Sequence, residues 1–411
     1  MSDRRPAVPG LQTISEQEVQ EMGSLLRSRV LTEVVAQVQS MLDQLDSATL
    51  DIAVTGESGA GKSTFVNAFR GLDDEHPDAA PTGVTETTRE VTPYAHPRIP
   101  TVRLWDLPGI GTPCFQADSY LQAVGLRRFD LVIIVASERF RESHAALARA
   151  VRAHGGRVYL VRNKVDRDVG AGLRRRAGAG GEEALLARIR EDCAGGLARC
   201  GLPGAPVFLV SCFQLQRYDF ERLQDTLEAE LDGLKRHALL LALPNLSAAA
   251  LAAKRRALAG TLWRTAMSAC LAAMAPGGAV RGSVPILVQA LRSYQRHFGL
   301  DQDSLQQLAA LTGKQYQELC AEVQSSAGRE LSESSVGDML SQVAVGQQLL
   351  AGLLESRVPV LGTITSGGVS FLACYWLLRS ALSDLSEDAG RVMSKALEGS
   401  DPGTKDTQMD I

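Results

Sequence analysis

Cysteine is scarce in this chain and forms no pattern of paired ligands. The seven cysteines among 411 residues are scattered, odd in number and never spaced as Cys-x-x-Cys. This usage fits a reducing compartment and argues against a disulfide framework or a cysteine-ligated zinc site. The chain also lacks an excess of positive charge, because its formal net charge is −4 at pH 7. We therefore expect no nucleic-acid partner.

Targeting signals and long apolar runs are also missing. The N-terminus lacks the apolar run of a signal peptide, and Ser2 excludes the Met-Gly start that N-myristoylation requires. The uncharged stretch 358–378 contains Pro359 and several glycines, and only 369–378 is strongly apolar. A membrane span needs about 20 apolar residues. We therefore expect a buried core helix here, with a surface or conditionally inserted segment and a true span as the alternatives.

The chain is long enough for two domains, since it has 411 residues of which 45% are hydrophobic. Short apolar strands alternate with helices over 49–237, which predicts an α/β domain with a mainly parallel sheet flanked by helices. Residues 238–398 show only helical periodicity. We expect an N-terminal helix within 15–48 to pack with that helical domain, and we expect 1–14 to be disordered and 399–411 to be a flexible tail.

Individual elements of the α/β domain follow from apolar runs and turn residues. Loops are predicted at 71–96 and at 168–181, where Gly, Pro, Thr, Asp and Arg gather. Helices are predicted at 145–153 and 182–199. The predicted strands are 50–55, 102–106, 131–136, 158–162 and 207–211.

A phosphate-binding loop follows the first predicted strand. The sequence from Gly56 to Ser63 fits G-x-x-x-x-G-K-[ST] in the required strand–turn–helix context. The loop amides and the helix N-terminus can bind phosphate oxygens, Lys62 can reach the β- and γ-phosphates, and the Ser63 hydroxyl can bind Mg²⁺. A hydrolase nucleophile elbow around Ser58 is the alternative, but Ala60 stands where its last glycine belongs. The expected phosphate-binding residues are Gly56, Glu57, Ser58, Gly59, Ala60, Gly61, Lys62, Ser63 and Thr64.

A second motif, D-x-x-G, ends the strand 102–106. Asp106 would hold Mg²⁺ through a water, and the Gly109 N–H would meet the γ-phosphate. The threonine-rich loop 82–88 lies between this motif and the phosphate loop, where a switch threonine would complete the Mg²⁺ shell, but spacing does not choose among its four threonines. Ile110 stands where Ras-like enzymes have a glutamine that orients water. Hydrolysis must therefore use another group or a partner, or be slow, and Glu86 is the only carboxylate in the threonine loop.

A third motif, N-K-x-D at 163–166, indicates that the nucleotide is a guanine nucleotide. It follows the strand 158–162. A carboxylate at its last position can accept two hydrogen bonds from guanine, whereas adenine offers no such pair of donors. The stem of the lysine can cover the base plane. The expected nucleotide-binding residues of this motif are Asn163, Lys164 and Asp166, and Ser211 and Cys212 are also expected to bind the nucleotide.

Together these residues resemble the immunity-related, interferon-inducible GTPases of the GKS type. The resemblance covers nearly the whole chain, from about residue 18 to residue 398. The C-terminal stretches Val-Pro-Val at 358–360 and Gly-Gly-Val-Ser-Phe at 367–371 are most similar to the cinema branch of that family. Other matching stretches are Thr-Gly-Val at 82–84, Thr-Pro-Tyr at 92–94, Leu-Trp-Asp-Leu-Pro-Gly at 104–109, Tyr-Asp-Phe at 218–220, Leu-Pro-Asn at 243–245 and Tyr-Gln-Arg-His-Phe-Gly-Leu-Asp at 294–301.

The resemblance implies a fold and a set of functional residues. The fold would be a Ras-like G domain inserted between N- and C-terminal helices that form an all-α domain. By position, Glu86 matches the acid thought to assist catalysis and Thr88 matches the switch threonine, whereas Asn163 stands where many members have threonine. The implied Mg²⁺ ligands are Ser63, Thr88 and Asp106. The implied catalytic set is Lys62, Glu86, Thr88 and Gly109.

The resemblance also implies an activity and partners. We expect GTP to be hydrolysed to GDP and phosphate, slowly and with stimulation by self-assembly, in homodimers or higher oligomers formed through the G domain. The expected location is the cytoplasm, with peripheral attachment to the endoplasmic reticulum or other internal membranes. The alternative is a GTP-binding scaffold with negligible turnover, in which the nucleotide only sets assembly.

Overall fold

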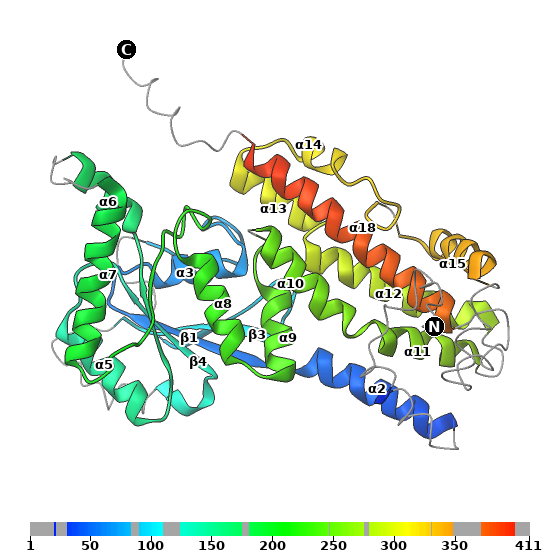
Figure 1. Ribbon diagram of the computed structural model, residues 1–411, viewed down its shortest axis with the longest axis horizontal. Coiled ribbons are helices and arrows are strands. Elements are labelled where there is room, and N and C mark those ends of the chain that lie inside the picture. The colour runs from blue at the N-terminus through cyan, green and yellow to red at the C-terminus, as the bar shows by residue number, and fades with distance from the viewer. Residues whose placement is uncertain are drawn as a thin grey trace, which may run out of the picture. The chain divides into compact units, whose positions relative to one another are not determined.

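The computed structural model describes residues 20–21, 31–83, 90–109, 124–174, 181–245, 247–274, 279–329, 331–347 and 371–398. The described residues fall into two compact units (Figure 1). The first contains the sheet and takes in Ser47–Ala253 and Gln306–Gln315, with Ala396–Ile411; the second is helical and takes in Met1–Asp46, Lys254–Leu305 and Tyr316–Lys395.

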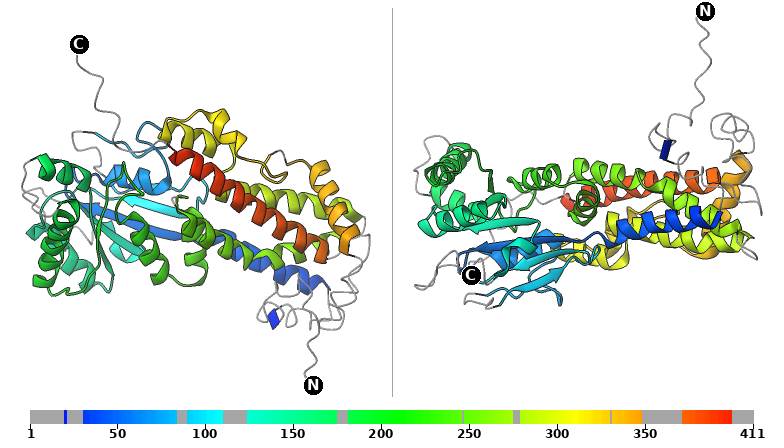
Figure 2. Two further views of the ribbon diagram at one scale, coloured as in Figure 1. Left: turned by 45° about the horizontal axis from the view of Figure 1, so that its top comes forward. Right: turned by 90° about the horizontal axis from the view of Figure 1, so that it is seen from below.

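Six strands form one sheet in the order β2-β3-β1-β4-β5-β6. The edge strand β2 is antiparallel to β3, and every other neighbouring pair is parallel. Every residue of β4 and β5 is buried, as expected for parallel strands covered on both faces (Figure 2). The predicted α/β Ras-like fold is confirmed. The strands are β1 Leu50–Gly56, β2 Thr92–Ala95, β3 Val102–Asp106, β4 Leu131–Ala136, β5 Val158–Arg162 and β6 Val207–Leu209.

Helices of the first unit cover this sheet with two apolar clusters. Phe65 and Phe69 of α3 meet Phe220 of α8, with ring centroids 6.1 to 6.3 Å apart. Leu147 of α5 and Leu197 of α7 belong to a separate cluster built around β4 and β5. Burying such side chains contributes about 1.5–3 kcal/mol each. The helices around the sheet are α3 Lys62–Arg70, α5 Glu142–Ala153, α6 Val165–Arg174, α7 Gly181–Arg199, α8 Phe220–Glu230 and α9 Gly233–Ala242.

Helix α6 corrects the prediction of a loop at 168–181. The glycines at 170 and 172 lower helix propensity, which is why the sequence indicated a loop. Here Gly172 lets α6 lie close to α7, because a Cβ at this position would lie 2.5 Å from Leu185 Cδ2 and that methyl group would have to shift. Asp166 and Asp168 in the first turn also favour the helix through its N-terminal partial charge.

Strand β2 corrects the prediction of a continuous loop at 71–96. Its proline at 93 is tolerated because an edge strand leaves one side of its backbone unpaired. Arg70 of α3 holds the strand in place, since its Nε donates to Ala95 O over 3.0 Å and its guanidinium lies over the Tyr94 ring. The register pairs Thr92 with Asp106, so β2 begins beside the end of β3.

From residue 218 onward, every described regular element is a helix, which agrees with the predicted periodicity. In the second unit α11 and α12 pack against each other, and α12 also packs against α15. Trp263 of α11 and Tyr375 of α18 are among the largest fully buried side chains. The remaining α-helices among the described residues are α2 Leu31–Ser47, α10 Ala248–Ala259, α11 Leu262–Met274, α12 Ala279–Phe298, α13 Gln302–Thr312, α14 Tyr316–Ala321, α15 Glu333–Gln347 and α18 Phe371–Leu397.

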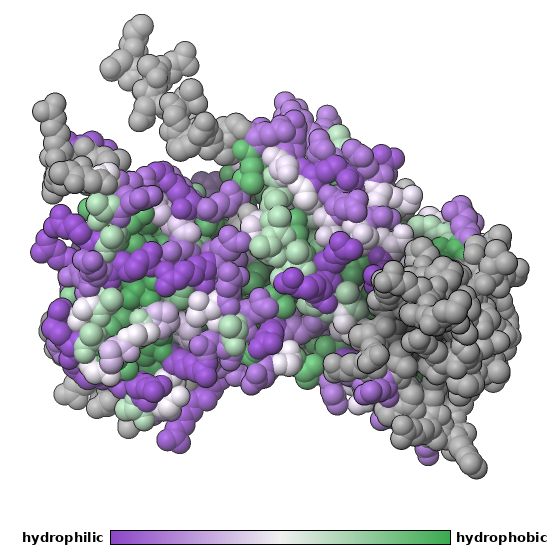
Figure 3. All heavy atoms as spheres, viewed as in Figure 1, coloured by the Kyte–Doolittle hydropathy of each residue, from purple (hydrophilic) through white to green (hydrophobic). Residues whose placement is uncertain are grey.

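The apolar end of the stretch 358–378 forms the start of α18. Phe371, Cys374 and Leu378 are fully buried there, whereas 358–370 lies outside the described residues. None of the described helices combines the length and the apolar character needed to cross a membrane. On the face shown in Figure 3, hydrophobic residues are interspersed among hydrophilic ones over the described surface.

Candidate functional site

The phosphate loop connects β1 to α3, and its two motif glycines are required sterically. Gly56 has φ 145°, and a Cβ there would lie 2.0 Å from Val135 O. Gly61 has φ 88°, and a Cβ there would lie 2.6 Å from Asn163 Nδ2. Any other residue at either position would collide with β4 or with the N-K-x-D segment, so the loop conformation depends on these glycines.

The first residues of α3 join the phosphate loop to the D-x-x-G motif. The largely buried Lys62 donates from Nζ to Glu57 O over 3.3 Å, and the Ser63 hydroxyl donates to Asp106 Oδ2 over 2.6 Å. Gly109 lies against the loop, because a Cβ there would be 3.0 Å from the Ser58 backbone. A cation, a hydroxyl and a buried carboxylate therefore gather at the N-terminus of a helix, where anions are favoured.

Asn163, after β5, ties three segments of the chain together. Its Nδ2 donates to Ala60 O over 3.1 Å, and its Oδ1 accepts from the Lys164 N–H at 2.8 Å and from Cys212 Sγ at 3.3 Å. Lys164 has a left-handed backbone with φ 62°, and its Nζ donates to Gly59 O over 2.7 Å. Desolvation of this amine lowers the pKa of Lys164. The lysine stem is thereby stretched from the N-K-x-D segment to the phosphate loop.

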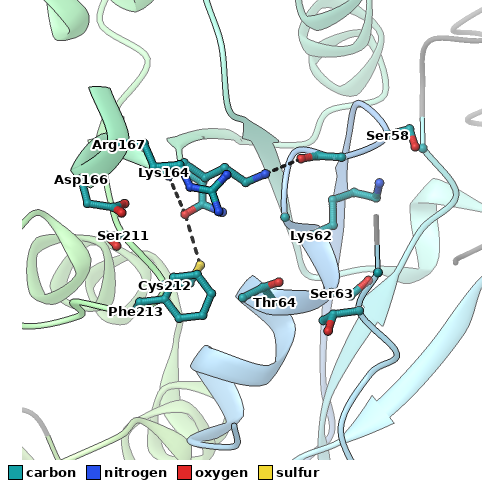
Figure 4. Close-up of a pocket in the computed structure, with 16 residues that line it drawn as sticks. Ser58, Lys62, Ser63, Thr64, Lys164, Asp166, Arg167, Ser211, Cys212 and Phe213 are labelled. Atoms are coloured by element: carbon teal, nitrogen blue, oxygen red, sulfur yellow. Dashed lines mark hydrogen bonds between the residues drawn. The ribbon is translucent and has the colours of Figure 1, made fainter. Parts of the chain in front are cut away.

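One cavity brings these segments together (Figure 4). Ser58, Gly59, Gly61, Lys62, Ser63, Thr64, Gly109, Asn163, Lys164, Asp166, Ser211 and Cys212, all predicted as site residues, line it. Ser211 is buried, and its hydroxyl has no hydrogen-bond partner among the described residues. Arg167 and Phe213 also line the cavity and were not predicted, although each directly follows a predicted residue. Glu86, Thr88 and Ile110 lie outside the described residues.

Glu57 is a phosphate-loop residue that does not line the cavity and is bound instead to the start of α5. Its Oε1 accepts a hydrogen bond from the Ser143 hydroxyl at 2.7 Å, and its Oε2 lies 3.3 Å from Arg141 Nη1. The buried His144 lies 3.8 Å from Oε1, and burial lowers the pKa of His144. The Arg141 guanidinium is therefore the permanent positive charge beside Glu57, and the start of α5 supports the loop.

The chain that leads into the threonine-rich loop is anchored to α3. The fully buried Asn67 donates from Nδ2 to Ala80 O over 3.0 Å and to Asp74 Oδ1 over 2.8 Å, and it accepts from the Ala80 N–H at 2.7 Å. Thr82 and Gly83, just beyond this anchor, line the cavity. The described part of the threonine loop thus begins at the same cavity as the three motifs.

The residues present fit a Mg²⁺–nucleotide complex. Mg²⁺ in such sites keeps several waters and binds one or two protein oxygens together with phosphate oxygens. The adjacent Ser63 hydroxyl and Asp106 carboxylate supply such oxygens. In the part of the chain that the structure describes, no group of three His, Cys, Asp or Glu residues is placed to hold a metal ion.

The sheet and the three motifs around one cavity define the G-domain class of nucleotide-binding proteins. The sequence profile of the interferon-inducible GTPase family matches residues 15–367, and the chain belongs to this family. The predicted family resemblance is thus confirmed.

Two relatives illustrate the match. The chain is 39% identical to interferon-inducible GTPase 5 of Bos taurus, covering 100% of this chain and 89% of the relative. It is 32% identical to interferon-gamma-inducible GTPase 10 of Mus musculus, covering 93% and 90%. Among solved structures, a Toc33 mutant from Arabidopsis thaliana shares 13% identity with a TM-score of 0.31, covering 43% of this chain and 77% of its own. That likeness is too distant to carry an argument, so the fold assignment rests on the sheet topology and the family.

Proposed function

We propose that this protein binds GTP with Mg²⁺ and hydrolyses it to GDP and phosphate. The observation that carries the proposal is the convergence of Lys62, Gly109 and Asp166, from three separate motifs, on one cavity. Membership of a family named for GTPases supports the same activity. The phosphate loop alone would fit many nucleotides, whereas the carboxylate of Asp166 favours the guanine donor pair.

The residues of the cavity have separate roles in positioning the nucleotide and in stabilising the charge that develops on its phosphates. Lys62 and the loop amides would bear negative charge that develops on the phosphates, and the Gly109 N–H would meet the γ-phosphate. Ser63 would bind Mg²⁺ directly and Asp106 would bind it through water. The ion would neutralise charge on the β- and γ-phosphate oxygens. By family resemblance we also assign Thr88 to the Mg²⁺ shell and Glu86 to the attacking water.

Assembly and location are further parts of the proposal. Ile110 cannot orient water, so we propose that self-association through the G domain completes the site and raises a slow basal rate. The protein would work in the cytoplasm and attach peripherally to internal membranes. Ile110 also favours the second candidate, a GTP-binding scaffold with negligible turnover.

GTP turnover per molecule, measured across a range of protein concentrations, distinguishes these functions. For an assembly-stimulated GTPase the specific rate rises with concentration. GTP binding without turnover at any concentration would favour the scaffold. Failure to bind either GTP or GDP would refute both.

Membrane attachment is tested by carbonate extraction of membranes from expressing cells. A peripheral protein is released into the supernatant. Retention in the pellet would show an integral segment and contradict a buried core helix at 358–378.

A further inference from the structure

Phe213 is an unusually exposed aromatic residue at the candidate nucleotide site. The exposed large hydrophobic residues among those described are Val35, Leu234, Leu311 and Phe213, and Phe213 is the most exposed at 72%. It is also the only aromatic of the four. An exposed phenyl ring of this size loses the favourable burial that other aromatics obtain. Its position in the cavity lining points to a ligand that covers it.

A hydrogen-bonded turn carries Phe213 at the edge of the cavity. Phe213 lies in a tight turn after β6, closed by a hydrogen bond of 3.1 Å from the Gln214 N–H to Ser211 O. The preceding residue, Cys212, is tied to Asn163 through its sulfur. The turn therefore belongs to the same hydrogen-bonded unit as the N-K-x-D segment. The backbone that carries the ring is thus held beside the cavity by short-range hydrogen bonds.

The ring and the Lys164 stem lie on two sides of the cavity in the view of Figure 4, and Asp166 lies at one end of the space between them. The Lys164 Nζ is bound to Gly59 O, so its methylene stem cannot swing away freely. A planar base whose edge reached Asp166 would have the lysine stem along one face. Its other face would then be offered to Phe213.

We propose that Phe213 is a platform on which the nucleobase of the bound nucleotide stacks, opposite the Lys164 stem. This inference rests on the proposed nucleotide binding and deepens it. Every base has a π-face, so stacking contributes affinity with little selectivity. Selection of guanine is then the task of Asp166, whereas Phe213 supplies strength of binding to any base that enters. The two roles separate experimentally.

The test is isothermal titration calorimetry of the full chain with GDP and with ADP. Base stacking on an aromatic residue is worth enough to predict that Phe213→Ala weakens GDP binding about 5- to 100-fold. The ratio of GDP to ADP affinity should stay near that of the parent, whereas Asp166→Asn should change this ratio. Phe213→Trp should restore GDP affinity, and Phe213→Leu should restore it only in part.

In turnover assays Phe213→Ala should raise KM and leave kcat unchanged, the mark of uniform binding.

Leu311→Ala is the matched control, because Leu311 is an exposed hydrophobic residue that does not line the cavity. It should bind GDP like the parent. Equal GDP affinity of Phe213→Ala and Leu311→Ala would overturn the inference. Unchanged affinity with a lost dependence of turnover on protein concentration would also overturn it, and would assign Phe213 to a contact between copies of the chain. If the parent itself binds no GDP, the proposed function fails, which the first titration reveals.

Discussion

The Ser143 hydroxyl, in the first turn of α5, donates a 2.7 Å hydrogen bond to the carboxylate of Glu57 in the phosphate loop. Because Glu57 does not line the cavity, this bond holds the loop from its outer side. The start of α5 is therefore a structural support for phosphate binding, although it contains none of the nucleotide-binding motifs.

Ser143→Ala should lower the free energy of unfolding by about 1–2 kcal/mol. The reason is that the charged, partly buried carboxylate of Glu57 loses a hydrogen bond. Urea unfolding of the nucleotide-free protein measures this. Ser394→Ala is the control, since the exposed Ser394 only bonds Gly390 O of its own helix. Its effect should stay within about 0.5 kcal/mol. Equal effects of the two substitutions would argue against a role of Ser143 in supporting the phosphate loop.

Asp166→Asn should weaken GTP binding and favour xanthosine nucleotides, because the base oxygen at position 2 accepts a hydrogen bond from an amide. The loss of one bidentate charged pair is expected to reduce GTP affinity at least about tenfold. Competition between GTP, XTP and ATP measures the change. If the unmutated protein binds GTP and ATP equally well, the assignment of 163–166 to guanine is wrong.

Lys62→Ala should remove tight nucleotide binding or turnover while the fold is retained. Its ammonium group lies at the N-terminus of α3, where the β- and γ-phosphates are expected. Circular dichroism checks the fold, and GTP binding and hydrolysis are then measured on the same sample. A folded variant with the GTP affinity and rate of the parent would contradict the role of this lysine.

Glu86→Ala should lower turnover more than it lowers GTP affinity, the mark of an interaction made mainly in the transition state. The residue is assigned from the motif and the family, since it lies outside the described residues. Single-turnover rates and the affinity for a non-hydrolysable GTP analogue separate the two effects. A variant rate equal to that of the parent would show that Glu86 has no catalytic role.

Cys212 should resist alkylation in the folded protein, although it borders the cavity. Burial raises the pKa of this thiol from 9.0 to about 12. Since the thiolate is the reactive form, iodoacetamide at pH 8 should modify it about a thousandfold more slowly in the native state than in urea, and the native rate should rise with pH. Mass spectrometry of the Cys212 peptide measures both rates. Rapid labelling of the native protein at pH 8 would contradict a buried, protonated thiol.

The parts of the fold that the sequence predicted are those carried by local patterns. The strands 102–106, 131–136 and 158–162 match β3, β4 and β5 residue for residue. The mainly apolar runs of β4 and β5 are typical of buried parallel strands, whereas β3 alternates buried and partly buried residues. The phosphate loop was predictable because its conformation requires glycine at positions 56 and 61. This requirement is visible in the sequence as a motif. Helix α6 was missed because its glycines at 170 and 172 lower helix propensity, whereas the close approach of Gly172 to Leu185 of α7 is not contained in any local propensity.

Parts of the site that depend on distant contacts could not be predicted. Glu57 was assigned to the nucleotide from its place in the motif. Its carboxylate accepts a hydrogen bond from Ser143, which is 86 residues away in the chain. Phe213 has no motif of its own, and its place in the cavity follows from the turn after β6. Contacts between residues far apart in the chain leave no periodic pattern in the sequence, so they could not be predicted from it.

The two anchors of the threonine loop also bear on how this protein can evolve. Asn67 holds Ala80 at one end, and the pairing of Thr92 with Asp106 holds the other, so neither anchor uses residues 84–89. The entropy of closing a loop between fixed ends grows only with the logarithm of its length, about 0.6 kcal/mol for each doubling. A change of length between the anchors therefore adds little closure entropy and removes neither anchor. Natural variation at 84–89 can change the sequence there while both anchors are inherited unchanged.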